Sequence, residues 1–185
     1  METELKNTEM YDDLERYLFG EVTKNWAQNR ELNPAEFRAV IRWKAWRANG
    51  RVKFIKNAAK IAEFTKGIYG AADYKELIPF LLEGKWNKQG MRLPLFSAFL
   101  GVFKPDDYPV IDIRVMAQLR VENRIRRKTI PDPDDKGFVW YFTVFRDALN
   151  KAKREKGLGS LRELDKHYWN RDRFKADIEA VKGIK

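Results

Sequence analysis

Apolar side chains recur every three or four residues along almost the whole chain, and this spacing is the strongest constraint on its fold. Such a period places apolar groups on one face of a helix, whereas a half-buried strand needs strict alternation. No convincing alternating stretch is present, although the aromatic residues of 138–144 favour strands. The sequence therefore predicts an all-α protein, and 138–144 is the segment where strand propensity competes with the helical pattern.

Local signals divide the chain into helices. Asn33-Pro34-Ala35-Glu36 combines an N-cap residue, a proline at the first helical position and a glutamate three residues after the cap. Ser160 and Glu163 form a second capping box, and Asp112 precedes a helix that we expect to run from Ile113 to about Arg127. The other expected helices cover about 11–22, 34–49, 54–67, 73–82, 93–103 and 138–156, and one begins after Ser160.

Composition excludes several kinds of chemistry. The 185 residues contain no cysteine, so a cysteine nucleophile, a Cys-zinc site and an iron–sulfur cluster are excluded. The single histidine, His167, argues against a His-rich metal site and a Ser-His-Asp triad, and we expect it to be a packing residue. We predict no metal and no cofactor.

The sequence also bears on location. No apolar run approaches the ~20 residues of a membrane span, so no membrane partner is expected. The acidic start, Met1-Glu2-Thr3-Glu4, is unlike a secretory signal. The expectation is a cytoplasmic, bacterial-type protein, which DNA binding would associate with the nucleoid.

Positive charge is concentrated in two parts of the chain. The formal net charge is +10, with +8 in residues 38–68 and +5 in 113–128, whereas residues 1–37 carry −5. If the two basic parts face the same way, they form a positive stripe that favours polyanions, most often nucleic acid. The alternative is a lysine-rich helical protein that binds another protein and whose charge is incidental.

The segment from Gly90 to Leu119 carries a family likeness. It combines a glycine turn at Gly90-Met91-Arg92, a small-residue helix over 96–100, a proline loop over 104–109 and an apolar run that ends at Asp112. In this order it resembles the centre of the helix-hairpin-helix GPD superfamily of base-excision DNA glycosylases, over about 30 residues or a sixth of the chain. The flanking segments 41–47 and 161–165 are similar to those of small bacterial proteins related to this superfamily.

The resemblance implies a fold and an activity. The fold would be a two-lobed helical unit with a degenerate helix-hairpin-helix, lobe one being approximately 1–50 plus 135–185 and lobe two approximately 51–134. The activity would be hydrolysis of the N-glycosidic bond of a flipped base, with the Asp112 carboxylate stabilising positive charge on the sugar and orienting water. The other interpretation is that Asp112 only caps the helix at Ile113; both roles are compatible.

Two residues depart from the family pattern. Arg92 replaces the second hairpin glycine, which would block the approach of backbone N–H groups to a phosphate or replace it with a guanidinium contact. Pro94 occupies the position of the lysine that forms a Schiff base in bifunctional members. Because proline has no amine, lyase activity of that type is not expected, and only a monofunctional glycosylase fits.

Cationic and aromatic residues near these segments are the candidate contacts to nucleic acid. The candidates for binding phosphate are Lys85, Lys88, Arg92, Arg114, Arg42 and Arg47, and those for a base pocket are Trp43, Trp46 and Tyr108. The alternative for the cationic residues is that they are only exposed to solvent in a turn or at a helix end. The alternative for the aromatic residues is that they pack in the core. DNA is the expected partner and RNA stays open. The hypotheses are thus a glycosylase, a nucleic-acid-binding module without turnover, and a partner-binding helical protein.

Overall fold

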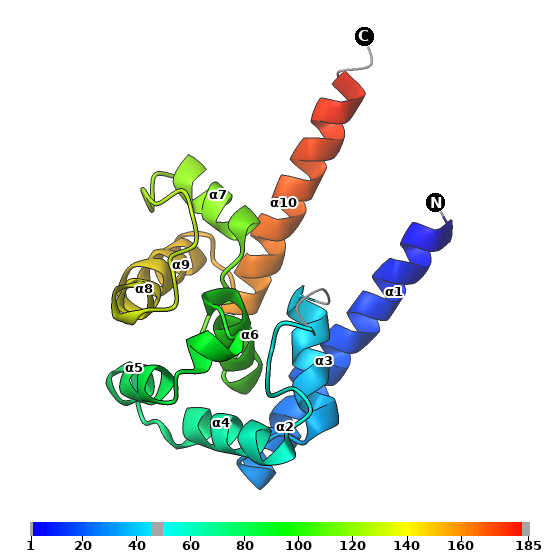
Figure 1. Cartoon of the computed structure of the whole chain (residues 1–185). Helices are drawn as coiled ribbons and strands as arrows, with labels where there is room; N and C mark the ends of the chain where they lie inside the picture. The colour runs from blue at the N-terminus through cyan, green and yellow to red at the C-terminus, as the bar shows by residue number, and fades with distance from the viewer. Residues whose placement is uncertain (1, 46–49, 183–185) are drawn as a thin grey trace.

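The computed structural model describes residues 2–45 and 50–182, and the side chains of 10–45 and 50–171. Within these residues there is no strand, which confirms the all-α prediction (Figure 1). The helices are α1 (Glu2–Tyr17), η1 (Leu18–Val22), α2 (Thr23–Asn29), α3 (Pro34–Ala45), α4 (Ala58–Gly70), α5 (Tyr74–Glu83), η3 (Trp86–Gln89), α6 (Leu93–Phe103), α7 (Ile113–Val121), α8 (Asp135–Trp140), η4 (Tyr141–Phe145), α9 (Arg146–Glu155) and α10 (Leu161–Lys182). No helix in the described ranges is both long and apolar enough to cross a membrane.

Two pairs of helices are joined end to end through a single π-helical turn. η1 links α1 to α2, and η4 links α8 to α9, so α1–η1–α2 and α8–η4–α9 each form one continuous helical rod. Such turns shift the helix face by one residue. The strand-prone segment 138–144 lies in the second rod and is helical, because its apolar side chains pack into the core on one side.

α6 is the central helix of the molecule. Every residue from Leu95 to Val102 is buried, and α3, α2 and η1 pack against it. A helix that is apolar on all sides is stable in water only when other helices enclose it. The aromatic side chains around it interlock: Phe37 of α3 stacks on Phe99 at 4.7 Å between ring centroids, and Phe64 of α4 meets Phe99 edge-on at 5.4 Å.

The capping signals hold. Asn33 accepts hydrogen bonds from the backbone N–H groups of Ala35 and Glu36, and the Glu36 carboxylate accepts one from Asn33 in return. Ser160 and Glu163 form the second box at α10. The predicted end of the helix at 49 lies outside the described residues.

Three sequence expectations need correction. α7 ends at Val121 rather than near Arg127, because Asn123 adopts a left-handed backbone conformation with φ of 55°. α4 covers Ala58–Gly70 rather than 54–67, because Asn57 caps it. His167 is exposed on α10, so it is not a packing residue.

Candidate functional site

Asp112 is held by a short irregular segment that is fastened to α6. Ser97 on α6 accepts a hydrogen bond from the backbone N–H of Ile111 at 3.0 Å through its hydroxyl. A Cβ at Gly101 would lie 2.8 Å from the Val110 side chain, so a small residue is needed for this approach. Tyr141 adds a hydrogen bond from its hydroxyl to the Pro109 carbonyl at 2.7 Å. The small-residue helix of the sequence prediction thus positions the start of α7.

The Asp112 carboxylate has two partners. One oxygen accepts from the backbone N–H of Arg114 at 2.9 Å, which makes Asp112 the N-cap of α7, as predicted. The other oxygen pairs with the Lys44 ammonium of α3 at 3.0 Å. Partial burial alone would raise the pKa of Asp112, but the Lys44 ammonium and the Arg114 N–H bring it below its ordinary value. The side chain is 30% exposed and ionised at neutral pH.

A buried network of charges lies close to Asp112. Arg162 of α10 pairs with Glu15 of α1 at 2.6 Å and with Asp165, one turn along α10. Its guanidinium lies over the rings of Phe19 and Trp43, at 5.4 Å and 5.1 Å from their centroids. The pKa of Asp165 is raised above its ordinary value, mainly because the carboxyl is buried. The nearby negative charge of Asp112 raises this pKa further, whereas the positive charge of Arg162 lowers it. Three helices, α1, α3 and α10, therefore meet at this network.

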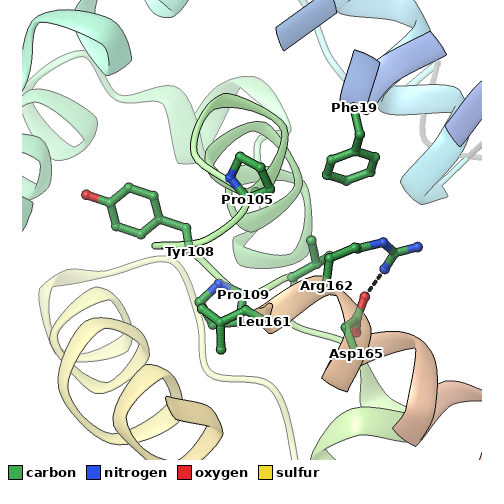
Figure 2. A pocket seen from close by; sticks show the side chains of 9 residues that line it. Phe19, Pro105, Tyr108, Pro109, Leu161, Arg162 and Asp165 are labelled. Carbon is green, nitrogen blue, oxygen red and sulfur yellow. Dashed lines mark hydrogen bonds and ion pairs between the residues drawn. The ribbon is translucent and has the colours of Figure 1, made fainter. Parts of the chain in front are cut away.

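A small pocket borders the same network (Figure 2). Its walls are mainly apolar, and Arg162 and Asp165 form its polar side. It is lined by Phe19, Gly101, Pro105, Tyr108, Pro109, Val110, Leu161, Arg162 and Asp165. Asp112 and the predicted phosphate-binding residues Arg92 and Arg114 do not line it. The carboxylate that the resemblance singles out therefore lies beside this pocket and not in its wall.

The aromatic candidates differ in position. Trp43 is only 6% exposed and packs edge-on against Phe19, so it is a core residue in this structure. Tyr108 lines the pocket and meets Phe142 edge-on at 6.0 Å, and burial raises its pKa. Trp46 lies outside the described residues.

The cationic candidates near α3 and α7 also separate. Arg42 is exposed on α3, and Arg47 lies outside the described residues. Arg114 is half-buried, with its guanidinium 4.9 Å from the centroid of the Trp169 ring on α10. Arg114 therefore joins α7 to α10, and its backbone N–H serves Asp112.

The predicted hairpin is a turn of 84–92 between α5 and α6. Its centre is η3, and Gly90 closes it with φ of 95°. A Cβ at Gly90 would lie 2.0 Å from the Arg51 carbonyl oxygen, because segment 51–53 packs directly on the turn. The Lys53 backbone N–H also donates to the Gln89 carbonyl at 2.9 Å. The glycine at position 90 therefore lets the protein's own backbone approach the turn closely.

This packing places two basic stretches side by side. The three predicted cations of the turn are exposed, and so are four cations of 51–60. Neither 51–60 nor 85–92 contains an acidic residue, and within the described part of the chain none of the seven cations forms an ion pair. We call this the hairpin basic surface; it comprises Arg51, Lys53, Lys56, Lys60, Lys85, Lys88 and Arg92.

Sequence reasoning missed two parts of this site. Lys44 is 68 positions from Asp112, and no local signal distinguishes it from the other cations of 38–68. Arg162 and Asp165 lie in the flanking segment 161–165, and Lys44 lies in the flanking segment 41–47. Both parts depend on contacts between helices that are far apart in the sequence, so no local pattern predicts them.

No group of three or more His, Asp or Glu side chains in the described ranges could hold a metal ion. Comparison of the chain with protein-family models, curated proteins and solved structures found no match.

Proposed function

We propose that this protein binds DNA through the hairpin basic surface. The observation that carries the proposal is the packing of segment 51–53 on the α5–α6 turn, because it merges two basic stretches that lie some thirty residues apart in the sequence. Lys60 donates a hydrogen bond to the Gln89 side chain at 3.4 Å, which adds a side-chain contact between the two stretches. Exposed cations that are not paired with carboxylates repel one another, and phosphates that lie against them reduce this repulsion. Phosphate contacts of this kind give affinity without reading sequence.

The aromatic residues favour a duplex as the ligand. Proteins that hold single strands stack bases on exposed rings. The two rings within the basic stretches, Phe54 and Trp86, are 2% and 1% exposed and belong to the core. The surface therefore offers cations but no stacking platform, which suits the regular phosphate backbone of a duplex.

A salt titration with matched variants tests the proposal. We compare wild type, a hairpin triple variant (Lys85→Gln, Lys88→Gln, Arg92→Gln) and a control triple variant (Arg16→Gln, Lys24→Gln, Lys75→Gln) that loses the same charge from exposed positions on α1, α2 and α5. Affinity for duplex DNA is measured over a range of salt concentrations. A plot of the logarithm of the binding constant against the logarithm of the salt concentration has a negative slope, and each lost phosphate contact reduces its magnitude by about 0.9. The magnitude of the slope for the hairpin variant should therefore be smaller than that of wild type by up to about 2.7.

The control variant should keep a slope close to that of wild type. A wild-type slope near zero, or equal slopes for the hairpin and control variants, contradicts DNA binding through this surface. Equal affinity for duplex DNA and duplex RNA would widen the ligand to any duplex, and preference for a single strand would contradict the duplex proposal.

A second candidate function is monofunctional glycosylase activity at Asp112. Its support is the family likeness of 90–119 together with an ionised, partly exposed carboxylate at the start of α7. Such a carboxylate can stabilise positive charge on a sugar. Because Lys44 already pairs with it, this activity requires that the ammonium move away when DNA binds.

The activity is tested with duplexes that carry damaged bases, followed by alkali to cleave abasic sites. Asp112→Asn should abolish the strand breaks and keep the salt slope of binding, because its amide retains the cap geometry. Breaks that survive in Asp112→Asn show that the carboxylate is not catalytic. The absence of breaks in wild type across the lesion panel leaves the DNA-binding proposal and removes the enzymatic one.

A further inference from the structure

The loop between α7 and α8 carries a second group of exposed cations. Arg126, Arg127 and Lys128 follow one another, all three are exposed, and none forms an ion pair within the described residues. We call them the loop basic segment. There is no acidic residue between 123 and 131. Positive charge is therefore concentrated at 126–128, whereas the acidic residues of the loop lie at its two ends, Glu122 paired with Arg124 and Asp132 and Asp134 after Pro131.

The loop is anchored at both ends although it has no helix. Ile125 is 5% exposed and Pro131 is buried, so core contacts hold the chain on either side of the cations. Arg124 adds ion pairs to Glu122 at 2.6 Å and to Glu155 at 2.5 Å. The chain is thus held on both sides of the cations before any ligand binds, which lowers the entropy cost of binding.

One of these cations is also positioned by an aromatic ring. The Arg127 guanidinium lies over the Trp140 ring, 5.6 Å from its centroid. A guanidinium stacked on a ring keeps its N–H groups available at its edge, which matches the geometry of a phosphate.

A hydrogen bond ties this loop to the hairpin basic surface. The Asn87 side-chain amide donates to the Pro133 carbonyl at 3.1 Å, and Asn87 lies between Lys85 and Lys88 in the turn. Lys128 is five residues before Pro133, which an extended chain spans in at most about 18 Å. One helical turn of duplex DNA is about 34 Å long. The loop basic segment and the α5–α6 turn of the protein are therefore closer together than one helical turn of the duplex.

We infer that the loop basic segment forms a second contact with the same duplex DNA that the hairpin basic surface binds. The inference rests on the proposed DNA binding and adds a second, separate group of phosphate contacts from a segment about forty residues further along the chain. A duplex that reaches both groups binds more tightly and more salt-dependently than one held by the turn alone.

The test adds two variants to the salt titration with a duplex of about one and a half turns. A loop triple variant (Arg126→Gln, Arg127→Gln, Lys128→Gln) should lower the slope by about 0.9 for each lost contact, up to about 2.7. The variant with all six changes should lower it by the sum of the two triples. Titration at high protein concentration should give one duplex per protein. Urea unfolding of each variant checks that the exposed changes leave the fold intact.

The outcomes separate this inference from the proposed function. If the hairpin triple lowers the slope and the loop triple does not, the second contact is wrong and DNA binding by the hairpin stands. If neither triple differs from the control triple, the proposed function fails together with the inference. A stoichiometry of two duplexes per protein overturns the claim that both groups hold the same duplex.

Discussion

At the scale of single residues, Glu122 is a carboxylate that binds several side chains from different helices. It lies just after α7, and its carboxylate accepts from Arg124 at 2.6 Å and from the Tyr168 hydroxyl at 2.7 Å. Lys156 of α9 pairs with it at 2.9 Å. Burial alone would raise the pKa of Glu122, but these donors lower it from an ordinary value of 4.5 to about 2. One carboxylate thus holds the end of α7 against α9 and α10.

We predict that Glu122→Gln destabilises the protein in a pH-dependent way. At about pH 7 the free energy of unfolding should fall by about 2 kcal/mol, because the amide cannot replace a charge-assisted network. A carboxyl whose pKa is depressed by folding stabilises above the unfolded pKa, and this contribution is lost as pH falls toward the folded pKa. The difference in the free energy of unfolding between wild type and Glu122→Gln should therefore become smaller below about pH 4.5. Urea unfolding at a series of pH values measures it.

The matched control is Glu155→Gln, which removes an exposed partner of the same Arg124. Exposed pairs contribute little, so its effect should be much smaller than that of Glu122→Gln and should not depend on pH in the same way. A Glu122→Gln gap that stays constant down to about pH 3 would show that the carboxylate charge is not what stabilises the junction.

The site residues differ in how far the sequence could predict them. The cap at Asp112 depends on its immediate neighbours, so local pattern is enough to find it. Its ion pair with Lys44 depends on how α3 packs beside α7, and nothing in the spacing of residues encodes that. Trp43 is a similar case, since its burial follows from Arg162 and Phe19, which approach from other helices.

At the scale of elements, helix beginnings with a recognised cap were predicted correctly, whereas the beginning of α4 at Asn57 and the end of α7 were not. The predicted caps at Asn33, Asp112 and Ser160 are hydrogen bonds within three residues, and all three are present. The end of α7 depends on the left-handed conformation of Asn123, and asparagine is also common within helices. The two π-helical turns leave no sequence signal, because they adjust a helix face to core partners that lie far away in the chain.

The hairpin illustrates the same limit. The sequence located the turn, its glycine and its three cations, because those lie within nine residues. It did not show that segment 51–53 would cover the glycine, since the contact depends on the path of a loop almost forty residues earlier. The basic surface arises from that path, and so its size could not be predicted from charge counts.

At the scale of the whole molecule, ion pairs connect the first and the last helix of the described chain. α1 and α10 both project from the body on the same side (Figure 1). Near the base of these helices, Arg162 of α10 pairs with Glu15 of α1, 147 positions away, and Lys166 pairs with the same glutamate. The division into two lobes stays a prediction, whereas this junction is seen directly.

Because Arg162 neutralises both Glu15 and Asp165, its loss should affect the whole fold. Arg162→Met leaves two carboxylates that are 8% and 10% exposed without their guanidinium partner, and it should lower the free energy of unfolding by about 3 to 5 kcal/mol. Arg171→Met, at an exposed α10 position, should cost less than about 1 kcal/mol. Combining Arg162→Met with Asp165→Asn removes one stranded charge and should recover part of the loss. Urea unfolding measures these three variants and Asp165→Asn alone. A double variant whose loss equals the sum of the Arg162→Met and Asp165→Asn losses would show that Arg162 and Asp165 do not act as a pair.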